Sequence, residues 1–133
     1  MSGGMDLAVL LRHMEPILDG VPYGYGVLPL GAMVPGKLAP FAVIAEAEGM
    51  TVVATAEAVT RAGIAHQGQW ARISLSVHSD LAAVGLTAAI AGELAKHGIS
   101  ANVVAGYFHD HVFVQWERRA AAMAALSALV EGK

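Results

Sequence analysis

The chain has 133 residues, enough for one compact domain or for two very small subdomains that share a sheet, and too few for a third domain. Hydrophobic residues make up 56% of it and charged residues 14%, against usual shares of about 45–50% and about 25%, so some apolar surface is expected to be buried by self-association. With a net charge of -3 and no basic cluster beyond Arg118-Arg119, the composition argues against binding of DNA or RNA.

The absence of cysteine excludes disulfides, thiolate nucleophiles and thiolate metal sites. The first residues, MSGGMDLAVLLRHMEP, lack the basic region and the long apolar run of an export signal. The longest weakly polar segment, residues 81–92, is well short of the roughly 20 residues that cross a bilayer. We therefore expect a cytoplasmic protein without a membrane span.

The chain is expected to begin with a helix and a strand. Apolar residues at helical spacing follow Asp6, and Pro16 closes that segment, which predicts one short helix. In residues 21–29 tyrosine and valine alternate with small residues, a period that predicts a strand. Residues 31–40 are rich in glycine and proline and are expected to form a loop.

The next segment, residues 41–48, is ambiguous because it combines Ala/Glu helix formers with the β-branched pair Val43-Ile44. We favour a strand, since Gly49 then begins a tight connection to a second strand over residues 51–54. A short helix is expected over residues 56–62, ended by a glycine.

The second half has clearer periodicity. Apolar and serine residues alternate over residues 73–77, which predicts a strand with one buried face. A helix is expected from about residue 81 to residue 97, with Ser79 or Asp80 as its N-cap and Gly98 as its C-terminal stop.

Two further strands and a helix complete this half. Residues 99–107 and 112–114 are expected to form a hairpin around His109-Asp110, and residues 117–130 a last helix. The order of elements in the second half is therefore βαββα.

Residues 73–114, with the sequence ISLSVHSDLAAVGLTAAIAGELAKHGISANVVAGYFHDHVFV, strongly resemble the ACT-like domains of small bacterial proteins built from two ACT-type halves. Tyr25-Gly26-Val27 and the segment 41–53 resemble a degenerate partner half. The resemblance implies an α+β fold, a ferredoxin-like ACT-type α/β sandwich with an antiparallel sheet and helices on one face. It divides the chain into an N-terminal half, residues 1–66, and a C-terminal half, residues 67–133.

ACT-type domains resemble the ferredoxin-like order βαββαβ, so one more strand must close the second half. The chain after residue 130 is too short to supply that strand. Either the first half lends it, or the order of elements is altered.

The resemblance also implies binding rather than catalysis, because ACT relatives include amino-acid-sensing domains that hold small ligands where the first strand meets the first helix. Independently, a helix N-terminus offers N–H groups and partial positive charge to a carboxylate, Gly85 would let backbone approach closely, and Asp80 could pair with an ammonium group. The residues expected to bind the ligand are His78, Ser79, Asp80, Val84, Gly85, Leu86, Thr87, Asn102, Val103 and Val104.

The expected function is therefore that of a non-catalytic regulatory or sensor protein, which binds a small molecule, with an amino acid as the expected ligand, and which forms a homodimer without a cofactor. Each site assignment has an ordinary alternative. Ser79 is equally explained as an N-cap, Val103 and Val104 as core residues, and Asn102 as a turn residue.

A metal site and an enzyme active site remain as alternatives. His109 and His111 could converge from one strand with His78 as a third ligand, although a hairpin turn also explains them. Catalytic pairs would be Ser79 with His78 or His111, or Glu46 with Glu48, which would share a strand face; no diagnostic motif surrounds either.

A third class is an interaction module that pairs two chains without any ligand. The remaining histidines carry no such hypothesis. His66 and His97 are expected in loops or at a helix end, exposed to solvent.

Overall fold

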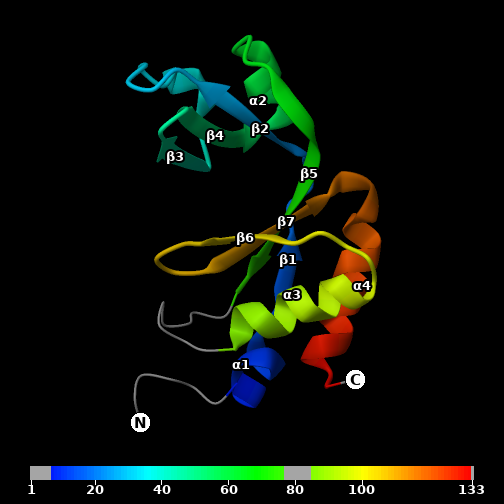
Figure 1. Cartoon of the computed structure of the whole chain (residues 1–133). Helices are drawn as coiled ribbons and strands as arrows, with labels where there is room; N and C mark the ends of the chain where they lie inside the picture. Colours follow the sequence, from blue (N-terminus) through cyan, green and yellow to red (C-terminus); the bar gives the residue numbers. More distant parts are fainter. Residues whose placement is uncertain (1–6, 77–84, 133) are drawn as a thin grey trace. The chain divides into compact units, whose positions relative to one another are not determined.

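The computed structural model describes residues 7–76 and 85–132. The chain forms two compact units (Figure 1). The continuous unit is Gly20–Trp70, and the split unit combines Met1–Asp19 with Ala71–Lys133. One strand, β5 (His66–Leu75), begins in the continuous unit and ends in the split unit. In the described ranges no helix is both long enough and apolar enough to cross a membrane.

The continuous unit is a four-stranded sheet with one short α-helix. Its elements are β2 (Tyr23–Leu28), the 3-10 turn η1 (Gly36–Leu38), β3 (Ala42–Glu46), β4 (Gly49–Thr55), α2 (Ala56–Arg61) and the first part of β5. The strands lie in the order β3-β4-β2-β5 and pair antiparallel. In place of the first helix of a βαββαβ unit, the chain has only the 3-10 turn.

The core of the continuous unit lies on one face of this sheet. Val52 and Ala54 on β4 pack there against Val59 of α2, together with Leu38 of η1. Gly26 of β2 leaves room for this packing, because a Cβ atom there would lie 2.8 Å from a methyl carbon of Ile64. The alternation expected for residues 21–29 is confirmed, since small residues occupy the covered face.

The split unit repeats the same strand order with more helix. Its elements are α1 (Leu7–His13), β1 (Pro16–Leu18), the second part of β5, α3 (Leu86–Lys96), β6 (Asn102–Ala105), β7 (Asp110–Gln115), the 3-10 turn η2 (Trp116–Arg118) and α4 (Arg119–Val130). Its strands lie in the order β1-β5-β7-β6. Counted along a βαββαβ unit, both sheets therefore have the order fourth, first, third, second.

The strand that closes the second half is β1, lent by the first half of the chain. Ile17 pairs with Ser74 and Leu18 with Ile73 in an antiparallel ladder. The first of the two expected solutions is thus confirmed. Strand β5 is shared in the same way, as the fourth strand of the continuous unit and the first strand of the split unit.

The core of the split unit lies between its sheet and its three helices. Ile73 and Val112 from the sheet pack with Leu10 of α1, Ile90 of α3 and Leu126 of α4. These side chains are almost fully buried. A ferredoxin-like α+β fold with an antiparallel sheet and helices on one face is therefore confirmed.

Three local predictions need correction. Strand β5 begins at His66, where a loop was expected, because its first residues pair with β2. Helix α3 begins at Leu86 and not at residue 81, since Gly85 is left-handed with φ of 98° and cannot continue a right-handed helix. Asp110 begins strand β7 and is not a turn residue.

Candidate functional site

The predicted ligand site centres on the connection between β5 and α3. His78, Ser79, Asp80 and Val84 lie outside the described residues. The residue that caps α3 is Gly85, so the expectation that Ser79 or Asp80 caps this helix is wrong. Gly85 has no side chain and makes no side-chain cap hydrogen bond, and its backbone is left-handed, a conformation that glycine adopts without strain.

Gly85 makes a close approach, but to another part of the protein. A Cβ atom at this position would lie 3.2 Å from Cδ2 of Leu7, on α1. The missing side chain therefore accommodates the N-terminal helix. Next to it, the Leu86 side chain is 2% exposed and belongs to the core, whereas Thr87 is exposed at the start of α3.

The second group of predicted residues, Asn102, Val103 and Val104, lies on β6 at the edge of the sheet of the split unit. Asn102 is a strand residue and not a turn residue, and its side-chain Nδ2 donates to the carbonyl oxygen of Phe113 over 3.4 Å. Val103 packs against the core. Val104 pairs with His111 across the ladder, so it stands on the opposite face of the strand from Val103.

His111 has a partner that sequence reasoning did not anticipate. Its Nδ1 lies 2.8 Å from the hydroxyl oxygen of Ser74 on β5. Burial lowers the pKa of His111, and the nearby charges of Arg72 and His109 lower it further, so the neutral imidazole is favoured. In the described ranges no group of three or more His, Cys, Asp or Glu side chains is arranged to hold a metal ion.

The proposed carboxylate pair does not form on one strand face. Strand β3 ends at Glu46, and Glu48 lies in the following turn. The hydroxyl of Thr51 donates to the carboxylate of Glu46, which ties this carboxylate to the neighbouring strand β4. The structure thus gives Glu46 a structural contact, and the expectation that Glu46 and Glu48 share a strand face is wrong.

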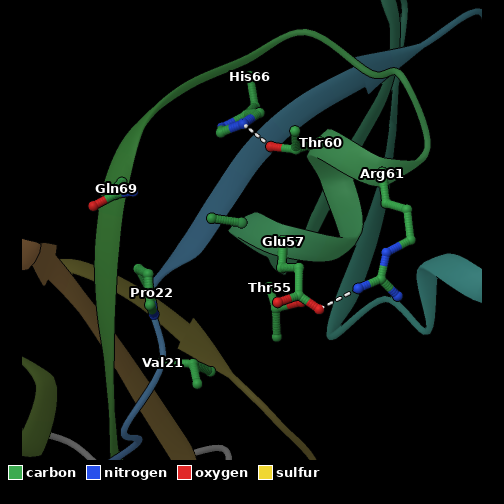
Figure 2. A pocket seen from close by; sticks show the side chains of 9 residues that line it. Val21, Pro22, Thr55, Glu57, Thr60, Arg61, His66 and Gln69 are labelled. Carbon is green, nitrogen blue, oxygen red and sulfur yellow. Dashed lines mark hydrogen bonds and ion pairs between the residues drawn. The ribbon is translucent and has the colours of Figure 1, made fainter.

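A cavity of about 680 Å³ lies entirely within the continuous unit, beside α2 (Figure 2). Nine residues line it: Val21, Pro22, Thr55, Ala56, Glu57, Thr60, Arg61, His66 and Gln69. None of them was predicted as a site residue. The spacing of Glu57, Thr60 and Arg61 on the predicted helix indicates one polar face, but the pairing of β5 with β2, which brings His66 and Gln69 to the cavity, has no local signal.

Family comparison assigns both halves of the chain. A model of the ACT domain matches residues 2–71, more than half of the chain, and a second ACT-domain model matches residues 66–128. The chain belongs to the ACT-domain family. The two ACT-domain matches overlap at residues 66–71, which lie in β5, the strand that both compact units use.

Several solved structures share this fold. A Vibrio cholerae protein of unknown function, described as a possible transport protein, is 45% identical; the match covers 93% of this chain and 95% of that one, with a TM-score of 0.83. An Agrobacterium tumefaciens protein is 14% identical and has a TM-score of 0.75, with 89% and 90% of the two chains covered. The comparison with curated proteins gave no match.

A third structure with this fold is the regulatory subunit of aspartate kinase from Thermus flavus. It is 14% identical, with a TM-score of 0.60 over 88% of this chain and 98% of that one. At such low identity the likeness shows the fold alone. The ACT domain is a regulatory module, and the two matches place the chain in this class.

Proposed function

We propose that this chain is a regulatory protein that binds a small molecule, with an amino acid as the first candidate, and that it acts without catalysis. The observation that carries the proposal is the pair of ACT-domain matches, which together span residues 2–128. The similar Thermus flavus structure is the regulatory subunit of an aspartate kinase, which supports the same class. The division into halves 1–66 and 67–133 stays a prediction about the sequence.

The proposed site is the connection that leads into α3, with its predicted residues 78–80 and 84–87 and the strand residues 102–104. Helix α3 has 11 residues, and its first-turn N–H groups and dipole suit a ligand carboxylate. Gly85 offers these groups no side-chain cap. Asp80 is proposed to receive the ligand's ammonium group, and the exposed hydroxyl of Thr87 to add a hydrogen bond.

The proposed assembly is a homodimer, and the proposed location is the cytoplasm, both from composition. A second candidate function, an interaction module without a ligand, is favoured by one feature of the hairpin between β6 and β7. Tyr107 and Phe108 there are 75% and 63% exposed, and their ring centroids are 5.0 Å apart. Exposed aromatic side chains of this kind are enriched where protein partners bind.

A thermal-shift screen of the purified chain against the common amino acids tests the proposal. A ligand that binds only the folded state stabilises it by about 2.7 kcal/mol at about one hundred times its Kd. Asp80→Asn and Thr87→Val should each reduce the shift, while Lys96→Gln, at the other end of α3, should keep it. Size-exclusion chromatography beside the screen reports the assembly state; no shift with any amino acid from a stable dimer would favour the interaction module.

A further inference from the structure

The cavity of the continuous unit has one wall formed by α2. Ala56, Glu57, Thr60 and Arg61 line it, at helical spacings that place them on neighbouring positions of one face. Glu57 and Arg61 form an ion pair one turn apart, with side chains that are 78% and 70% exposed. Such an exposed pair contributes little to stability, so a ligand with charges of its own can replace it at small cost.

The opposite wall is β5, where His66 is held by a hydrogen bond and by close packing against β2. Its Nε2 lies 3.0 Å from the hydroxyl oxygen of Thr60, and Figure 2 shows this hydrogen bond bridging the strand and the helix. The other nitrogen, Nδ1, lies 2.8 Å from where a Cβ atom would stand on Gly24. The imidazole is therefore wedged against the backbone of β2, and only glycine leaves space for it there.

The remaining lining supplies an apolar surface and a free amide. Val21 and Pro22, just before β2, present carbon atoms to the cavity. The hydroxyl of Thr55 is already used, because it accepts from the backbone N–H of Ala58 and caps α2. Within the described ranges the side chain of Gln69 has no hydrogen-bond partner in the protein, so its amide can both donate to and accept from a ligand.

These groups select a ligand by charge. One carboxylate and one guanidinium stand a helical turn apart, so a ligand with two negative charges would be repelled by Glu57 and one with two positive charges by Arg61. A zwitterion satisfies both, with its carboxylate on the planar guanidinium and its ammonium on the carboxylate. The volume of about 680 Å³ is within the range of about 300–1,000 Å³ that small-molecule pockets occupy.

We infer that this cavity is a second ligand site, which binds a small zwitterion such as a free amino acid through Glu57 and Arg61 at its exposed side and through Gln69 on β5, with the imidazole of His66 as part of its wall. The inference goes beyond the proposed function, because it assigns a site in the other unit of the chain. It uses none of the residues of the connection between β5 and α3. Either site can therefore fail without the other.

The test is a two-dimensional amide NMR titration of the full chain with each common amino acid. For an amino acid that binds, its N-acetyl derivative, which lacks the cation, and its α-amide, which lacks the anion, are titrated in parallel. The expected result is a set of shifts at Thr60, His66 and Gln69, with an affinity about tenfold lower for either derivative. Equal affinity for the derivatives would overturn the zwitterion assignment.

Matched variants separate this site from a general effect of surface charge. Glu57→Gln and Arg61→Gln should each weaken the amino acid's binding about tenfold. Lys96→Gln, which breaks the exposed Lys96–Glu93 pair on α3, should leave it unchanged. Shifts confined to Gly85 and Thr87 would overturn the second site and support the proposed function. Shifts confined to residues of the cavity would support the second site and count against the site at the start of α3. No shift with any amino acid would overturn both sites.

Discussion

The hydroxyl oxygen of Ser74 lies 2.8 Å from Nδ1 of His111, which joins β5 to β7 on the face of the sheet opposite the helical core. The imidazole of His111 also lies within electrostatic reach of Arg72 on the same face. Burial and this neighbouring cation disfavour a second positive charge. The lowered pKa of His111 therefore favours the neutral imidazole in the folded protein.

The first prediction concerns pH. Because the pKa of His111 is lowered in the folded state, the unfolded chain binds a proton more readily, and stability falls as the pH drops from the ordinary value of 6.5 towards the lowered pKa. When urea unfolding is measured at a series of pH values, His111→Gln should flatten this part of the plot of unfolding free energy against pH. Ser74→Ala should keep the slope and lower stability by about 1 kcal/mol at every pH. An unchanged slope in His111→Gln would show that the pKa of His111 is not lowered in the folded protein.

The second prediction tests whether the N-terminal segment is part of the core of the split unit. Leu10 on α1 is 2% exposed, whereas Ile17 on β1 is 55% exposed. Leu10→Ala should cost about 2–5 kcal/mol of unfolding free energy because it leaves a cavity, and Ile17→Ala should cost less than about 1 kcal/mol. Chemical denaturation measures both. Equal small losses would mean that α1 does not pack as described.

The third prediction compares two glycines near and within α3. Gly85→Ala should destabilise the protein by about 1–3 kcal/mol, since φ is 98° and the new Cβ would lie 3.2 Å from Leu7. Gly92, in the middle of α3, has no atom within 4 Å of its ideal Cβ position, so Gly92→Ala should stabilise by about 0.5–1 kcal/mol. Thermal melts of the two variants should shift in opposite directions, and shifts of the same sign would contradict this backbone geometry.

The fourth prediction tests how His66 is held. A Cβ atom at Gly24 would lie 2.8 Å from Nδ1 of the imidazole, so Gly24→Ala should displace the ring and break its hydrogen bond to Thr60, at a cost of about 1–3 kcal/mol. Gly20→Ala, with open space around it, is the matched control and should change stability by less than about 0.5 kcal/mol. The ring resonances of His66 in NMR spectra report the displacement. Unmoved resonances in Gly24→Ala would refute the packing.

Local patterns were sufficient for most elements. The two-residue alternation in Tyr23–Leu28 and the apolar stripe of Leu86–Lys96 correctly predicted a strand and a helix, because the face that each element buries is written into neighbouring residues. The start of α3 was missed, because Ser79 and Asp80 are residue types that commonly cap helices. A glycine can adopt a left-handed backbone, but its presence in the sequence does not show that it does so, and Gly85 does.

The sequence by itself determined most of the elements, the ACT-domain resemblance and the need for one more strand in the second half, but it gave no strand at Pro16–Leu18. Only the tertiary structure decided that Pro16–Leu18 supplies that strand, that β5 serves both units, and that His66 and Gln69 face α2 across a cavity. The physical reason is that these relations are pairings between segments distant in the chain. Backbone hydrogen bonds make such pairings largely independent of side-chain type, so register and partner are set by the packed core and not by a local pattern.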